Sequence, residues 1–265
     1  DLFDAIDWGL IIYDEVHLLP APIFRFTADI QSRRRLGLTA TLVREDGMEG
    51  EVFSLIGPKR FDVPWKEIES QGYIAPADCI EVRVNLTEDE RMNYATAEQE
   101  NRYRFCSTTK TKHNVAIGLA KKHKDEQVLI IGQYLDQLDA LAEELGVPVI
   151  KGETPVKERE ELFAAFRTGE LKCLVVSKVA NFSVDLPDAT IAIQVSGAFG
   201  SRQEEAQRLG RILRPKSDGR GATFYSIVSR DTVDQDFAQN RQRFLAEQGY
   251  SYKIIDADDV FQGKI

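Results

Sequence analysis

The carboxy-terminal half of this chain alternates short apolar runs with longer stretches whose apolar residues recur at helical spacing. Such runs predict buried strands, and regular alternation of strand and helix predicts a parallel sheet covered by helices on both faces. The expected strands are Val128–Ile131, Val147–Ile150, Leu171–Ser177, Thr190–Val195 and Ala222–Val228. The expected helices are Leu135–Leu145, Glu158–Arg167, Arg202–Leu213 and Thr232–Glu247.

The segment before this alternation predicts one more strand and two helices. Ile80–Leu86 alternates apolar with charged or polar residues, which is typical of a half-exposed strand. Thr87 is a suitable cap for a polar helix over Glu88–Arg104, and a second helix is expected over Thr111–Lys122. Residues 52–73 are irregular in pattern and carry two prolines, so we expect the connection between two domains there.

A second strand signal lies near the start of the chain. The run Leu10–Leu19 reads LIIYDEVHLL and predicts a buried strand that ends at the adjacent carboxylates Asp14 and Glu15. Ser32–Thr41 predicts a neighbouring strand that runs into a hydroxyl-lined turn. Ligands of open α/β sheets bind at the carboxyl ends of strands, where nucleotide-driven motors place a Mg²⁺-holding Asp and a water-orienting Glu. Taken alone, a bare Asp-Glu pair is more typical of a surface turn after a core strand.

Length and composition limit the kind of protein. The 265 residues, 43% of them hydrophobic, are enough for about two domains, which we expect over residues 1–75 and 76–265. Because the first core strand follows Asp1 so closely, we expect this chain to be part of a longer protein. No run is long and apolar enough for a membrane helix, and three widely spaced cysteines favour a reducing compartment. With a net charge of −9, binding to nucleic acid requires local basic patches.

The segment Arg202–Pro215, RQEEAQRLGRILRP, places Gln207, Arg211 and Arg214 on one narrow face of the expected helix. Arginine stabilises the charge on a transferring phosphoryl group because its planar fork can hold two oxygens. A solvated basic face is the alternative. Gly210 favours the functional interpretation, since a glycine inside a helix costs roughly 1 kcal/mol and so suggests close approach of another backbone.

These segments together resemble a known family. DEVH at residues 14–17, LTAT at residues 38–41 and QRLGRILR at residues 207–214 resemble motifs II, III and VI of the superfamily-two DExH helicases. The triplet Arg44-Glu45-Asp46 after LTAT, and the block SGAFGSRQEEAQRLGRILRPK, resemble the XPB-type (xeroderma pigmentosum group B) DNA repair helicases along essentially the whole chain. The resemblance implies a complete second RecA-like motor domain, preceded by the last strands of the first.

The resemblance also implies residue roles at the nucleotide. Asp14 would hold Mg²⁺, Glu15 would polarise the hydrolytic water, and His17 and Thr39 would link the nucleotide state to the other domain. Further residues that the resemblance places at the nucleotide are Arg211 and Arg214 at the γ-phosphate, Gln207 beside them, and Asp185 near the ribose.

Other residues are implied to contact DNA. Gln133 matches motif IV, at the end of the strand Val128–Ile131. Ser177 and Lys178 resemble motif V, which contacts the nucleic-acid backbone. Arg44, Glu45 and Asp46 would face the duplex junction, and the polar helical stretch Glu88–Arg104 is the candidate for the thumb insertion that this family carries.

The function implied is that of an ATP- and Mg²⁺-dependent DNA helicase of nucleotide excision repair, in a bacterial cytoplasm and at the nucleoid. Its partners would be DNA and a nuclease or another repair protein, with no membrane. No G-x-x-x-x-G-K-[ST] sequence occurs in the chain, and the family places that phosphate-binding loop before motif II. We therefore expect this chain to hold half a nucleotide site and to be inactive alone.

Two other functions fit the same residues. One is a DExH motor that translocates on duplex DNA, or an RNA helicase, and only the Arg44-Glu45-Asp46 triplet separates these from a DNA-unwinding enzyme. The other is a non-catalytic module that binds DNA or a repair partner, which the missing phosphate-binding loop favours for the chain by itself.

Overall fold

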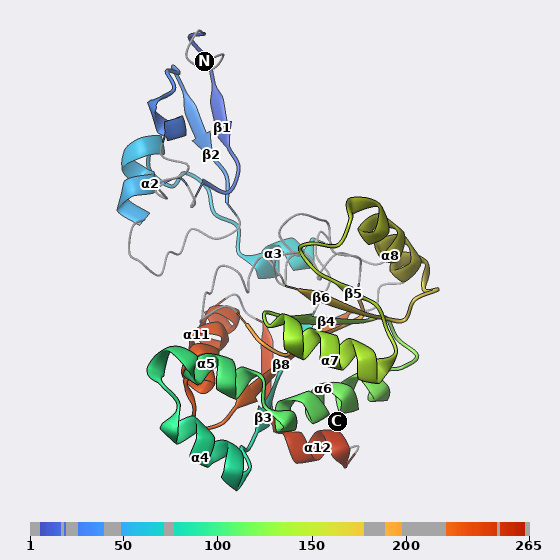
Figure 1. Cartoon of the computed structure of the whole chain (residues 1–265). Coiled ribbons are helices and arrows are strands. Elements are labelled where there is room, and N and C mark those ends of the chain that lie inside the picture. Colours follow the sequence, from blue (N-terminus) through green and yellow to red (C-terminus); the bar gives the residue numbers. More distant parts are fainter. Residues whose placement is uncertain are drawn as a thin grey trace. The chain divides into compact units, whose positions relative to one another are not determined.

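The computed structural model describes residues 6–16, 19, 26–39, 49–71, 77–177, 189–197, 221–247 and 250–262. The chain divides into two compact units, and in sequence the division falls between Val63 and Pro64 (Figure 1). The expected irregular connection over residues 52–73 instead holds parts of two helices, α2 (Glu49–Ile56) and α3 (Trp65–Ser70), while Gly57 and Pro64 lie between them.

The first unit contains a pair of parallel strands, as the sequence predicted. Strand β1 (Ile11–Tyr13) pairs with β2 (Arg35–Gly37), and the 3-10 helix η2 (Phe26–Asp29) precedes β2. Val16, Leu19 and Val52 form a small hydrophobic core in this unit. The expected burial of β1 is wrong for this chain: Ile12 is 56% exposed, because no layer of the described residues covers that face of the pair.

The second unit contains a seven-stranded sheet in which every pairing is parallel, in the order β5-β6-β4-β7-β8-β3-β9. This confirms the predicted parallel α/β architecture. The strands are β3 (Ala77–Val84), β4 (Val128–Gly132), β5 (Val149–Ile150), β6 (Cys173–Ser177), β7 (Ile191–Gln194), β8 (Ala222–Ser229) and β9 (Ser251–Asp256). The helices are α4 (Glu88–Thr96), α5 (Gln99–Ser107), α6 (Lys110–Lys122), α7 (Leu135–Leu145), α8 (Val156–Thr168), α11 (Val233–Glu247) and α12 (Ala257–Phe261).

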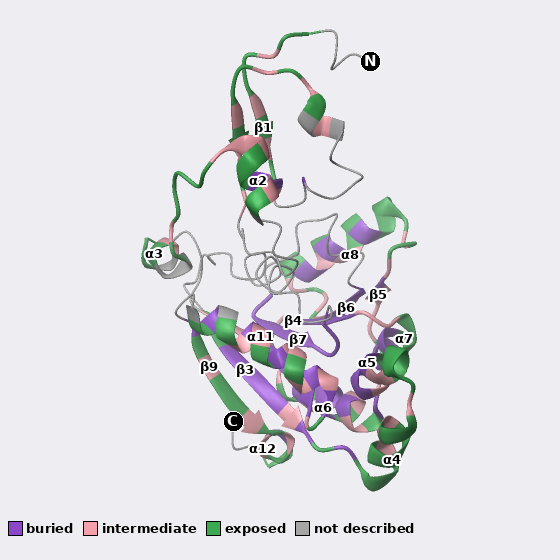
Figure 2. Ribbon diagram, turned by 90° about the vertical axis from the view of Figure 1, so that its left-hand side faces the viewer, coloured by how far each residue is buried: buried purple, intermediate pink, exposed green. Residues whose placement is uncertain are grey.

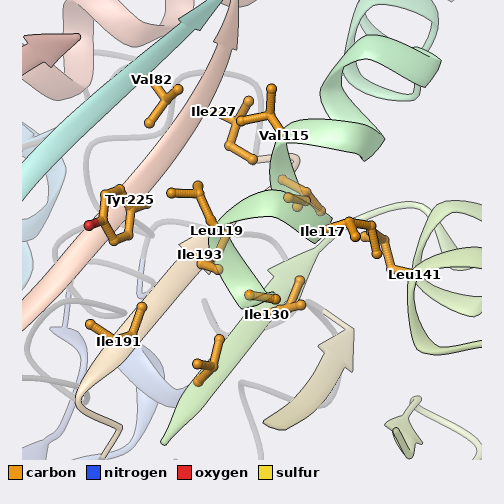
Figure 3. Packing of buried hydrophobic residues seen from close by; sticks show 14 of the residues in the cluster. Val82, Val115, Ile117, Leu119, Ile130, Leu141, Ile191, Ile193, Tyr225 and Ile227 are labelled. Carbon is orange, nitrogen blue, oxygen red and sulfur yellow. The ribbon is translucent and has the colours of Figure 1, made fainter. Parts of the chain in front are cut away.

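Helices cover both faces of this sheet. On one face, Tyr225, Ile193 and Ile130 of three neighbouring strands pack in the same core as Leu119 of α6 (Figure 3). The alternate residues of the strands point the other way. There Arg241 of α11 donates a hydrogen bond from Nη2 to Ser226 Oγ at 3.3 Å, so α11 lies on the opposite face from α6.

Strand β3 is more buried than its sequence suggested. It lies between β8 and β9, and all four of its residues 79–82 are buried (Figure 2). Glu81 is fully buried, where its carboxylate accepts hydrogen bonds from Arg83 and from the Tyr252 hydroxyl of β9. The prediction of a half-exposed strand missed β9, which pairs with β3 along six residues.

The polar stretch after β3 forms two helices instead of one. Helix α4 begins with a capping box, in which Thr87 Oγ1 accepts from Glu90 N–H at 3.2 Å and Glu90 Oε2 accepts from Thr87 N–H at 3.0 Å. This confirms Thr87 as the cap. The chain turns at Ala97 and Glu98 before α5, and α4 has no buried residue whereas α5 buries Tyr103, Cys106 and Ser107.

A buried ion pair joins α6 to α11. Lys112 Nζ lies 2.7 Å from Asp234 Oδ2, and the two side chains are 0% and 2% exposed. The same Asp234 oxygen accepts a hydrogen bond from Ser229 N–H at 2.9 Å, which ties the end of β8 to the start of α11. Removing one member of such a pair leaves a buried charge without compensation.

We expect Lys112→Met to lower the free energy of unfolding by about 3 to 5 kcal/mol, because Asp234 would keep its buried charge. Urea denaturation of the 265-residue chain measures this. Lys157→Met is the matched control, since Lys157 is 90% exposed and pairs with Glu161 at 3.9 Å, and it should cost less than about 1 kcal/mol. Equal losses in the two variants would contradict this account of the pair.

Candidate functional site

The turn after β1 carries two of the predicted nucleotide-site residues, Asp14 and Glu15. Glu15 adopts a left-handed conformation with φ of +50°, and its N–H donates to Asp14 Oδ1 at 2.9 Å. Asp14 is exposed and lies at the carboxyl end of a parallel strand, and its second carboxylate oxygen takes no part in this bond. Mg²⁺ in nucleotide motors is bound by one or two carboxylates together with phosphates and water, so this carboxyl group fits the ion only in company with a nucleotide.

Leu38 brings the Asp14–Glu15 turn next to Thr39. The Leu38 N–H donates to Tyr13 O at 2.8 Å, and the Leu38 carbonyl accepts from Val16 N–H at 3.0 Å. Leu38, the residue directly after β2, therefore holds both sides of the turn. Thr39 is the next residue, so the structure brings the expected motif II and motif III residues to the ends of two adjacent strands.

Sequence reasoning missed Gly37, which this arrangement requires. A Cβ atom at position 37 would lie 2.8 Å from Val16 Cγ2, closer than real Cβ contacts allow. Val16 is 4% exposed and packs in the small core with Leu19 and Val52. The available signal was a glycine inside an apolar strand, which is typical of close approach by another part of the chain.

In the second unit, Gln133 and Ser177 lie at the same edge of the sheet. Ser177 is the last residue of β6, Gln133 directly follows β4, and Gly132 and Ser177 are register partners on these neighbouring strands. Ser177 Oγ and Gln133 Oε1 are both buried and have no hydrogen-bond partner within the described part of the chain. A buried oxygen without a partner is costly, so these two atoms make this edge a candidate site.

Tyr134 and Arg104 flank this edge. The Arg104 guanidinium carbon lies 5.4 Å from the centroid of the Tyr134 ring, and Arg104 Nη2 pairs with Asp136 Oδ2 at 2.9 Å. Burial, and secondarily the Cys106 sulfur, raise the pKa of Tyr134 to about 12. The Tyr134 hydroxyl is therefore protonated at neutral pH and can donate a hydrogen bond, while the Arg104 charge is compensated by Asp136.

The other predicted site residues lie outside the described residues, so their roles stay predictions. They are His17, Arg44, Glu45, Asp46, Lys178, Asp185, Gln207, Arg211 and Arg214. Within the described ranges, no group of three or more His, Cys, Asp or Glu side chains could hold a metal ion. Nor is any helix in those ranges long and apolar enough to cross a membrane.

The fold is shared with solved structures of the DEAD-box protein Dbp5. The chain matches Saccharomyces cerevisiae Dbp5 bound to RNA and ADP BeF3 with a TM-score of 0.64 at 16% identity, covering 97% of this chain and 61% of that one. It matches the C-terminal domain of the DEAD-box protein Dbp5 with a TM-score of 0.53, covering 72% of this chain and 96% of that one. The fold is therefore RecA-like, as the sequence predicted.

Comparison of the amino-acid sequence with known families identifies the family to which the chain belongs. Residues 68–264 match the family described as ERCC3/RAD25/XPB C-terminal helicase, and the chain belongs to this family. It is 71% identical over 263 residues to a DNA 3'-5' helicase XPB of Kineococcus radiotolerans, covering 99% of this chain and 47% of that protein. It is 71% identical to a protein of the same name from Mycobacterium tuberculosis, covering 98% of this chain and 47% of that one. The chain thus spans about half the length of these relatives.

We expect Gly37→Ala to loosen the Asp14–Glu15 turn, because the added methyl group would push Val16 out of its core. Overpacking of this kind costs about 1 to 3 kcal/mol. Hydrogen–deuterium exchange of the Val16 and Leu38 amides should accelerate in the variant. Gly9→Ala is the control, since a Cβ atom there meets nothing within 4 Å, and its exchange should match that of the unmodified chain. Unchanged protection in Gly37→Ala would contradict the assigned packing.

Proposed function

We propose that this chain is the carboxy-terminal motor portion of an ATP-dependent DNA helicase that serves nucleotide excision repair. The observation that carries the proposal is the Leu38 bridge, which sets Asp14, Glu15 and Thr39 together at the strand ends of the first unit. In a member of the XPB family, this is the arrangement that a motor needs to sense bound nucleotide.

The nucleotide half of the proposal assigns roles to both units. Asp14 holds Mg²⁺ through the carboxylate oxygen that does not accept from Glu15 N–H, and Glu15 orients the attacking water. Thr39 and His17 link the nucleotide state to the other domain. Bound ATP supplies the γ-phosphoryl group, on which an arginine fork stabilises the spreading negative charge. The proposed contributors from the second unit are Gln207, Arg211, Arg214 and, at the ribose, Asp185.

The DNA half rests on the carboxyl edge of the seven-stranded sheet. Ser177 Oγ can donate to a phosphate oxygen, and Gln133 offers an unsatisfied amide oxygen together with its N–H₂ group. Lys178 follows Ser177 directly and adds a positive charge in sequence. Arg44, Glu45 and Asp46 of the first unit are proposed to meet the duplex junction.

The rest of the motor is proposed to come from the part of the protein that this chain does not span. The chain has no phosphate-binding loop sequence, so its carboxylates and arginines act only when such a loop holds the nucleotide. A nuclease or another repair protein is the proposed protein partner, and the bacterial cytoplasm at the nucleoid is the proposed location.

Translocation on duplex DNA without strand separation is the second candidate function. It is favoured by the name of a Saccharomyces cerevisiae relative, a "General transcription and DNA repair factor IIH helicase/translocase subunit XPB/SSL2", which is 38% identical and of which this chain covers 31%. The same nucleotide and DNA residues would serve this function.

The direct test is ATP hydrolysis by the protein restored to full length, with and without single-stranded DNA. DNA should stimulate hydrolysis in the restored protein, and the 265-residue chain alone should be inactive. Arg211→Ala should lower the DNA-stimulated rate by about 10³-fold or more, because the charge on the transferring phosphoryl group would lose its stabilising fork.

Arg243→Ala is the matched control, since Arg243 is an exposed arginine of α11 outside the proposed site. It should retain the full rate. A restored protein that binds DNA but ignores ATP would establish a binding module and contradict the motor. An oligonucleotide displacement assay on the active protein separates unwinding from translocation on duplex DNA.

A further inference from the structure

The Ser196 hydroxyl links the ends of β4 and β7. It accepts a hydrogen bond from Gln133 N–H at 2.7 Å and donates one to Gln137 Oε1 at 3.1 Å. Gln137 Nε2 in turn donates to Ser107 O, the last residue of α5, at 2.6 Å. Ser196 is 2% exposed, so water does not compete for these bonds. A directed chain of hydrogen bonds therefore runs from Gln133 through Ser196 to α5.

The next residue, Gly197, is held at both of its backbone polar groups by a single side chain. The Tyr103 hydroxyl donates to Gly197 O at 2.8 Å and accepts from Gly197 N–H at 3.1 Å. Tyr103 is 3% exposed, and its ring packs edge-on against Phe237 of α11 at a centroid distance of 5.0 Å. Burial raises the pKa of Tyr103, so its hydroxyl keeps the proton that it donates.

Close packing leaves these strand ends little room to move independently. A Cβ atom at Gly132 would lie 2.9 Å from Val195 Cγ2 and 3.0 Å from Ser196 Oγ. A Cβ atom at Gly197 would lie 2.7 Å from Gln194 Nε2. Since interiors packed this tightly transmit displacement rather than absorb it, a shift of the backbone at Gln133 must move Ser196 and Gly197.

We propose that Ser196 and Tyr103 are positioning residues that couple DNA binding to ATP hydrolysis. This inference rests on the proposed function, in which DNA engages Gln133. In sequence, Gly197 is followed by Gln207 ten residues later and by Arg211 fourteen residues later. DNA bound at Gln133 thus shifts the backbone at Gly197 through the Ser196 hydroxyl and the Tyr103 clamp. Because the arginine-bearing sequence follows Gly197 along the chain, DNA binding acts through this backbone on the arginines.

The chemistry of this cluster favours coupling over simple packing. Apolar side chains could fill the space between β4, β7 and α5 without the need to satisfy buried polar atoms. The Gln133 side-chain oxygen lacks a partner in the described part of the chain, while its backbone N–H is fixed by Ser196. The residue whose side-chain oxygen the proposed function assigns to DNA is therefore also the residue whose backbone N–H is held by the hydrogen-bond chain.

The test uses the full-length protein and measures four quantities: the ATPase kcat without DNA, the kcat with saturating single-stranded DNA, the KM for ATP and the Kd for the DNA. Ser196→Ala removes the link while it retains a small side chain. We expect the ratio of stimulated to unstimulated kcat to fall about tenfold, within the range of allosteric coupling. The unstimulated kcat, the KM and the Kd should each stay within about twofold.

Tyr103→Phe is the second variant, because it removes the Gly197 clamp and keeps the ring against Phe237. It should lower the stimulation ratio in the same way. Ser229→Ala is the matched control: Ser229 is also fully buried, and its hydroxyl also donates to a backbone oxygen, Cys106 O, at 2.7 Å, outside the chain of bonds described above. It should lose a similar amount of thermal stability and retain the full stimulation ratio.

Three results would overturn the inference. Both variants could retain full stimulation, or they could lower the stimulated and unstimulated rates in equal proportion, which is the result of a purely structural role. Ser229→Ala could lose stimulation as strongly as they do, which would make the effect one of stability. An unmodified protein whose ATP hydrolysis ignores DNA would contradict the proposed function itself, and that outcome is visible before any variant is made.

Discussion

Parallel pairing of the strands is the constraint on which the rest of this structure depends. When every strand runs the same way, all carboxyl ends meet at one edge, and residues that are distant in sequence become neighbours there. Gln133, Ser177 and Ser196 reach one edge of the seven-stranded sheet in this way. Asp14 and Thr39 are brought together by the same rule in the two-stranded pair of the first unit.

The buried polar groups show how this fold holds charge away from water. Glu81 is neutralised by Arg83, and Asp234 by Lys112, so each buried carboxylate has a cation and further hydrogen bonds. The carboxyl edge differs, because the buried Ser177 Oγ and the Gln133 side-chain oxygen have no hydrogen-bond partner among the described residues. Native proteins satisfy nearly all such atoms, and these two lie at the edge at which we propose that DNA binds; Ser107 Oγ and Arg159 Nε are further buried atoms of this kind elsewhere in the unit.

Sequence periodicity predicted most of the fold, and its failures have physical causes. The apolar runs located β4 to β8 because strands buried on both faces need continuous apolar sequence. The alternating run Ile80–Leu86 was misjudged, because Glu81 is buried by pairing with Arg83 and Tyr252, which no local pattern reveals. The motif resemblance named Asp14 and Gln133 as candidate site residues. It could not find Ser196 or Tyr103, whose significance lies in contacts between segments far apart in sequence.

The central claim is that the carboxyl edge of the seven-stranded sheet faces DNA. A photoreactive amino acid placed at Gln133 of the full-length protein, with single-stranded DNA bound, tests this claim most directly. A matched probe at Lys124, in the loop before β4 at the opposite end of that strand, serves as the reference. The account predicts efficient crosslinking to DNA from position 133 and background crosslinking from position 124. Equal crosslinking from both positions, or crosslinking from position 124 alone, would contradict it.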